Sequence, residues 1–188
     1  MEADWSVEIA SGLPIIDGSW EGFIDLQTSP QRIDAVAEAQ HPALRAALLA
    51  LNAKNLPLFT TKCDAWTLAD HEIDPDEFGA SGEHARVGFA SYIDILERDA
   101  ARFISFEFHE QRVSDIATHL RSLALRDGRV DLVVRGGFWK EQGGYGFTLY
   151  AAGCGISKSI AYAAWQAVLD AAVAATIAAA AQPPCSGE

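Results

Sequence analysis

Two parts of this chain echo each other. Residues 22–26 (GFIDL) are similar in sequence to residues 91–95 (SYIDI). Downstream of each, a cation and a tryptophan stand four residues apart, as Lys62 and Trp66 and again as Arg135 and Trp139. In each half, one helical stretch lies between the five-residue segment and the cation–tryptophan pair. Such an echo predicts two βαβ units in tandem, because each unit needs a strand, a crossover helix and a second strand.

Alternating apolar residues and turn signals predict the positions of the elements. We expect main strands at residues 20–26, 58–66, 87–96, 130–139 and 145–152, with an extra edge strand at 5–9. A helix should begin after Ser29 and break at Pro42, a second should begin at Ser105, and a third should follow Gly155. The predicted fold is α+β, with a ferredoxin-like βαββαβ core, an added strand and a C-terminal Ala-rich helix. We expect one domain over residues 1–182 and a flexible tail at 183–188.

Composition restricts the partners of the protein. Of its 188 residues, 49% are hydrophobic and 21% are charged, which is typical of a chain with a full core. The net charge of −12 argues against nucleic acid and against anionic membrane surfaces, since both need clustered lysine and arginine. Glu2 and Asp4 stand where a secretory signal would carry basic residues, so we expect a cytoplasmic protein.

The segment from Ile160 to Ala181 is long and apolar enough to suggest a membrane span. However, alanine dominates it, and Asp170 near its middle would cost roughly 2.5–3.5 kcal/mol on insertion. We therefore expect no membrane. The prediction is an Ala-rich helix that packs closely on a sheet or on another subunit.

Strand alternation sorts each predicted strand into two faces. One face of each strand is apolar and should meet the helices. The opposite face collects charged and aromatic side chains from four strands. Its predicted members are Asp25, Lys62, Asp64, Trp66, Tyr92, Asp94, Asp131, Arg135 and Trp139.

Three interpretations of this polar-aromatic face stay open. The last helix could cover it, a second copy of the chain could pair with it, or it could bind a ligand. As a pocket, it would use Lys62 and Arg135 to hold a carboxylate or phosphate, while its aromatic residues stack on a flat group. The ligand would then be small and anionic or aromatic. The candidate ligand-binding residues are Asp25, Lys62, Asp64, Trp66, Tyr92, Asp94, Arg135 and Trp139.

The segment 70–84 is rich in acidic residues and carries two histidines. Oxygen and imidazole ligands suit divalent cations, although the spacing fits no named metal site. A solvated acidic loop between two strands is the alternative. The candidate metal ligands are Asp70, His71, Asp74, Asp76 and His84.

These patterns contain no paired catalytic motif, and we predict no cofactor. The leading hypothesis is a non-enzymatic protein, a homodimer or other homo-oligomer, whose sheet face binds a small ligand or a partner subunit. One alternative is a metal-assisted hydrolase or isomerase that uses the 70–84 loop. Another is an acidic inhibitor or immunity-type protein that binds a basic partner.

Overall fold

The computed structural model describes residues 1–83 and 85–181, and over these residues the protein is an α+β fold built on a six-stranded mixed sheet. Along the sheet the strands lie in the order β1-β5-β6-β4-β3, and the short β2 extends the β1 side by pairing with β5. β1 and β2 run parallel to β5, and the other neighbours are antiparallel. The strands are β1 (Glu2–Glu8), β2 (Ile16–Asp17), β3 (Leu58–Leu68), β4 (Val87–Glu97), β5 (Gly128–Trp139) and β6 (Gln142–Gly155). The predicted tail at 183–188 lies outside the described residues.

The helices begin where the sequence supplies caps. Pro42 opens α1 (Pro42–Leu51), as its fixed φ and missing N–H favour. Ser105 and Ser157 accept backbone hydrogen bonds at the starts of α3 (Phe106–Arg121) and α4 (Lys158–Ala180). A short α2 (Ala100–Ile104) precedes α3. Four 3-10 turns complete the described elements: η1 (Pro30–Ala35), η2 (Ala37–Gln40), η3 (Asp70–Glu72) and η4 (Asp76–Phe78).

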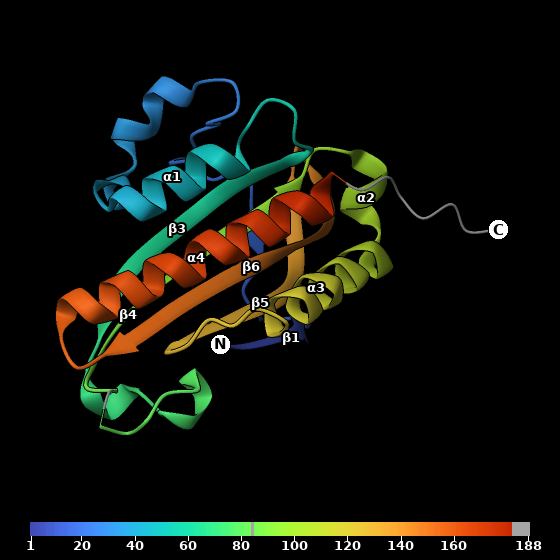
Figure 1. The fold of residues 1–188 in the computed structure, drawn as a ribbon. Coiled ribbons are helices and arrows are strands. Elements are labelled where there is room, and N and C mark those ends of the chain that lie inside the picture. The colour runs from blue at the N-terminus through green and yellow to red at the C-terminus, as the bar shows by residue number, and fades with distance from the viewer. Residues whose placement is uncertain (84, 182–188) are drawn as a thin grey trace.

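The helices α1, α3 and α4 lie on one face of the sheet, with α4 running between the other two (Figure 1). The main core fills the space between this helical layer and the sheet. Trp165 of α4 is fully buried there, and its indole N–H donates to Ser91 Oγ of β4 at 2.9 Å. Other buried members of this core are Leu44, Leu48, Ile93, Ile116, Leu120, Leu132, Leu149 and Val168.

The predicted ferredoxin-like order is not confirmed. In a split βαβ arrangement the first strand would lie between the third and fourth. The structure has no strand at residues 20–26, and β6 occupies the position between β4 and β5. The edge strand expected at residues 5–9 is present as β1 and pairs with β5. The general α+β class is therefore confirmed, while its specific topology differs.

The segment around residues 20–26 turns because of its own side chains. The Trp20 ring folds over Gly22, where an added Cβ would lie 1.8 Å from the ring. Asp25 Oδ1 then accepts from the backbone N–H of Gln27, a local bond that favours a turn over an extended chain. Apolar spacing alone could not show either contact.

The helix α4 is long and apolar enough to cross a membrane by length and composition. In this structure it packs on β6 and β4, with Trp165, Leu169 and Ala172 fully buried. Packing of the Ala-rich helix on the sheet agrees with the prediction.

Candidate functional site: the open face of the sheet

The sheet face away from the helices carries a row of matched polar and aromatic residues. Register places Asp64 of β3 opposite Tyr92 of β4, Tyr92 opposite Tyr150 of β6, and Tyr150 opposite Asp131 of β5. Opposed residues share a face, so the four side chains cross the sheet in one line. We call the surface formed by Lys62, Asp64, Trp66, Tyr92, Asp94, Asp131, Arg135, Thr148 and Tyr150 the open face.

The aromatic residues of the open face lie close enough to touch one ligand. The Trp66 and Tyr92 ring centroids are 6.3 Å apart, and those of Tyr92 and Tyr150 are 6.0 Å apart. The guanidinium carbon of Arg135 lies 5.7 Å from the Tyr150 ring centroid. Trp66, at the β3 end of this series, is 37% exposed. The series therefore presents an aromatic surface across three strands.

A chain of charged and polar groups runs beside the aromatic row. Thr148 donates to Asp94 at 2.6 Å, and Arg135 donates to Thr148 at 3.2 Å. Arg135 also forms an ion pair with Glu8 of β1 at 2.8 Å. Burial raises the pKa of Asp94, while the Thr148 hydrogen bond and the charges of Arg135 and Lys62 oppose that shift. Arg135, which the sequence predicted to hold a ligand anion, is thus already paired with a carboxylate of the protein, that of Glu8.

Replacing Asp94 with asparagine should raise the thermal midpoint at pH 7–8 and have less effect as the pH falls toward about 4. The reason is that a carboxyl whose pKa is higher in the folded state costs stability above its unfolded-state pKa, which is near 3.8. Below that value both states bind the proton and the cost vanishes. Scanning calorimetry of both proteins between pH 4 and 8 measures this difference. A gain that grows toward acid pH would contradict the assignment.

Tyr92 remains a hydrogen-bond donor throughout the physiological range. Burial, followed by the charges of Asp94 and Asp64, raises the pKa of its hydroxyl to about 12. A protonated phenol next to two carboxylates can donate to a ligand acceptor, while the ring stacks on the ligand.

Chain segments close both ends of the open face. At one end, Trp139 packs against Phe59 and Phe103, with Ile16 from the N-terminal segment completing this small core. At the other end, Ile73 and Phe78 anchor residues 70–83 to the sheet. This second end bounds a hollow of about 450 Å³ that includes Trp66, Asp131, Arg135 and Tyr150 in its lining.

Two predicted members of the face are not available there. Asp25 is not on a strand; it forms an ion pair with Arg98 at 2.5 Å. Trp139 lies on the same side of β5 as Arg135, as alternation requires, but it is covered by the small core described above. The remaining candidates, Lys62, Asp64, Trp66, Tyr92, Asp94 and Arg135, all belong to the open face, and Asp131 does as well.

The candidate metal ligands do not form a cluster in the part of the chain that the structure describes. Asp70 forms an ion pair with Arg86 at 3.6 Å, and Asp74 accepts from the backbone N–H of Asp76. His84 lies outside the described residues. The segment is not merely a solvated loop, since the buried side chains Ile73 and Phe78 fix it to the sheet.

Sequence reasoning missed three contributors, namely Glu8, Thr148 and Tyr150. The alternation within residues 145–152 could have identified Tyr150 and Thr148 as neighbours on one face, because they are two residues apart. Glu8 could not have been found this way, since its contact with Arg135 depends on the parallel pairing of β1 with β5.

Comparisons with protein-family models, curated proteins and solved structures found no match for this chain. The function is therefore argued from the geometry of the site.

Proposed function

We propose that this protein is a non-enzymatic binding module that holds a small, flat, positively charged organic molecule on the open face. The observation that carries the proposal is the aromatic series Trp66, Tyr92 and Tyr150, with the carboxylate Asp64 opposite Tyr92. Aromatic faces attract flat rings and cations, and nearby carboxylates add to the attraction for a cation.

The charges of the open face favour a cation over an anion. Arg135 is already paired with Glu8, and Arg129 with Asp131 and Glu77 at 2.6 and 2.5 Å. Among the described residues, Asp64 and Asp94 form no ion pair within 4 Å. An anion that approaches Arg135 or Arg129 would have to displace an existing partner, which leaves only Lys62 at the β3 edge of the face without an ion pair among the described residues. A cation would meet the unpaired carboxylates Asp64 and Asp94.

The hollow beside Trp66 and Tyr150 suits a small molecule, while Tyr92 and Asp64 lie outside its lining. Its volume of about 450 Å³ falls within the range of roughly 300–1,000 Å³ that is common for ligand pockets. The small residues Ala90 and Ala152 line it together with the larger Trp66 and Tyr150, so a flat group has room beside the aromatic rings. The sequence predicted a small anionic or aromatic ligand. This proposal keeps the aromatic group and replaces the negative charge with a positive one.

Titration with N-methylquinolinium tests the proposal, with neutral quinoline as the matched probe. Isothermal titration calorimetry should show saturable binding of the cation and weaker binding of quinoline. Trp66→Ala should weaken cation binding about tenfold, because a cation–π contact contributes about 1–2 kcal/mol when partly desolvated.

Phe138→Ala is the control variant. Phe138 is similarly exposed, at 38%, but strand alternation places it on the other face of β5. Its loss should leave the affinity unchanged. The proposal fails if N-methylquinolinium does not saturate, or if the two variants bind it equally well.

The other functions considered from the sequence stay predictions. These are a homodimer that pairs through this face, a metal-assisted hydrolase or isomerase, and an inhibitor of a basic partner. Measuring the mass in solution for the wild type and for Trp66→Ala would test the first of them on the same samples.

A further inference from the structure

A second, larger hollow lies at the outer edge of β3. Its volume is about 580 Å³, and it is bounded by β3 and by the segment from Trp20 to Glu38. A β-bulge in β3 between Thr60 and Cys63 shifts the register at this point. Bulges commonly occur where a strand redirects side chains next to a site. The bulged residues of β3 therefore form part of the wall of the hollow.

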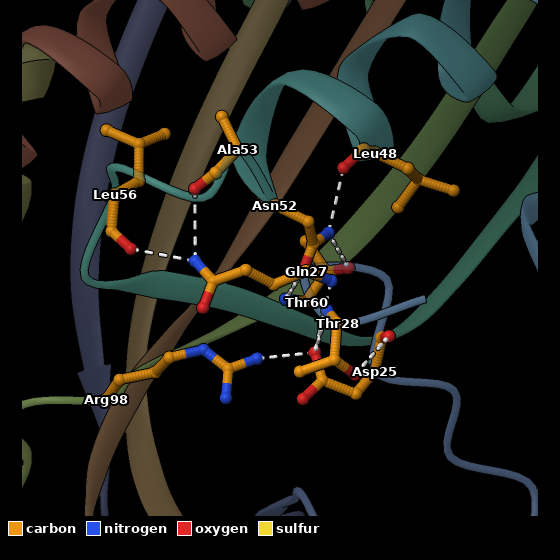
Figure 2. A network of polar contacts seen from close by, with 9 residues as sticks. All are labelled: Asp25, Gln27, Thr28, Leu48, Asn52, Ala53, Leu56, Thr60 and Arg98. Carbon is orange, nitrogen blue, oxygen red and sulfur yellow. Dashed lines mark hydrogen bonds and ion pairs between the residues drawn. The ribbon is translucent and has the colours of Figure 1, made fainter. Parts of the chain in front are cut away.

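The walls of this hollow are held in place by polar contacts. Gln27 donates to the backbone carbonyls of Ala53 and Leu56 at 3.0 and 2.9 Å (Figure 2). In the same view, Arg98 holds Asp25, which lies two residues before Gln27. These bonds fix the N-terminal segment against the chain that joins α1 to β3. A cavity with fixed walls binds at a lower cost in ordering.

A further contact fixes the mouth of the hollow. The indole N–H of Trp20 donates to the Thr61 carbonyl at 3.3 Å, which ties the segment directly to the bulge. Lys62 Nζ lies 5.4 Å from the centroid of the same indole ring. The ammonium group is thereby positioned at a wall of the hollow.

The lining combines an apolar wall with charges of both signs. Ile24, Leu26, Val36 and Leu48 form much of the apolar part. Lys62, Glu38 and Asp64 supply one positive and two negative groups. None of these three forms an ion pair within 4 Å with any described residue. Charged groups that surround a cavity without pairing are available to a ligand.

Cys63 also lines the hollow, together with Glu38 and Asp64. Burial raises the pKa of its thiol to about 12, with further contributions from Glu38 and Asp64. Both carboxylates therefore act on the same thiol, and the thiol stays protonated. A protonated thiol is a poor nucleophile, so this residue serves as part of the wall rather than as a reactive group.

We infer that this hollow binds a small zwitterion with an apolar side chain, that is, a hydrophobic amino acid. Its carboxylate would meet Lys62, its ammonium group would meet Glu38 and Asp64, and its side chain would lie against the apolar wall. A simple anion would face two carboxylates, and a simple cation would face the lysine. A molecule with both charges complements the lining better than either. The two hollows share no lining residue, although Lys62, Asp64 and Tyr92 of this lining also belong to the open face.

Calorimetric titration of the intact protein with L-phenylalanine and L-leucine tests the inference. The matched probes are 3-phenylpropanoate, which lacks the ammonium group, and 2-phenylethylamine, which lacks the carboxylate. At least one amino acid should bind saturably, and each analogue should bind at least about tenfold more weakly than L-phenylalanine, because each leaves a charged group of the site unpaired. Absence of saturation with both amino acids overturns the inference, as does an analogue that binds as tightly.

Two lysine variants complete the test. Lys62→Met should weaken binding of the amino acid at least about tenfold but should not weaken binding of 2-phenylethylamine, which has no carboxylate and would be repelled by the lysine. Lys54→Met removes an exposed lysine that does not line the hollow and should change neither. Equal affinities in the two variants would overturn the inference. Trp66→Ala should not alter amino acid binding, which separates this site from the hollow on the open face.

Discussion

Replacing Arg112 with alanine is expected to lower the free energy of unfolding by about 3–5 kcal/mol. Arg112 of α3 forms an ion pair with Glu97 at the end of β4, and both side chains are almost completely buried. Burial lowers the pKa of Arg112 to about 10, so the guanidinium is still charged at neutral pH. Its removal would leave the Glu97 carboxylate in the interior without a partner, and it would also remove the stacking of the guanidinium on Phe108.

Urea unfolding followed by circular dichroism measures this loss. Arg45→Ala is the matched control, because Arg45 also lies on a helix and pairs with an aspartate, Asp34, but at the surface. An exposed pair contributes less than about 1 kcal/mol, so this variant should remain close to the wild type. Equal losses in the two variants would refute the argument from burial.

A double variant tests whether the pair itself stabilises the fold. Glu97 Oε2 and Arg112 Nη2 have no hydrogen-bond partner among the described residues, so the cost of burying the two charges is incompletely offset. Changing Glu97→Leu and Arg112→Met together should therefore recover most of the stability lost in Arg112→Ala. A double variant that is less stable than the single one would contradict this account.

The ion pair also bears on the shape of the open face. Glu97 pairs with Arg112 in the helical layer, while the next residue, Arg98, pairs with Asp25 in the segment before η1. The Arg98 guanidinium pairs with Asp25 and lies 4.6 Å from the Phe59 ring centroid. The last residue of β4 and the one after it thus tie the sheet to α3 and to the N-terminal segment.

Alternation predicted much of the open face correctly, because side-chain direction along a strand depends only on local geometry. In β3, however, the bulge shifts the register, so that residues before it lie on the opposite face from the one that simple alternation predicts. Thr60 is paired with Ile95 on the helical side and bonds to Asn52, while Phe59 packs with Trp139 on the other side. Simple alternation predicts that Thr60 shares a face with Lys62. No local signal at residues 60–63 indicates that a bulge inserts an extra residue here.

The glycines near residue 143 misled the prediction for a different reason. The predicted strand began only at residue 145 because Gly143 and Gly144 suggest a turn, yet Lys140 and Glu141 form the turn with φ values of 50° and 62°. Gly144 lies within β6, where an added Cβ would be 2.6 Å from Phe103. Glycine is required here by packing against α2, a long-range contact that turn propensities do not include.

Strand order was the least predictable part of the fold. The pairing of β1 with β5 joins residues more than 120 positions apart. Nothing in the alternation of either strand specifies that partner. The internal sequence similarity therefore predicted which residues share a face, but not which strands are neighbours.

Replacing Gly153 with alanine should destabilise the protein by about 3 kcal/mol or more, because α4 packs directly on this glycine of β6. An added Cβ would lie 2.1 Å from the backbone nitrogen of Trp165, so the helix itself would have to move. The Ala-rich composition of α4 permits this close approach. Displacing the helix would also disturb the buried hydrogen bond from Trp165 to Ser91.

Gly143→Ala provides the control within the same strand. An added Cβ at Gly143 would meet nothing within 4 Å, so this variant should unfold at nearly the same urea concentration as the wild type. Similar midpoints for the two variants would rule out close packing as the reason for glycine at position 153. Tyr150 lies three residues before Gly153 on β6, with its ring on the opposite face of the sheet. The helical packing on one side of β6 therefore supports the position of the candidate binding residue on the other.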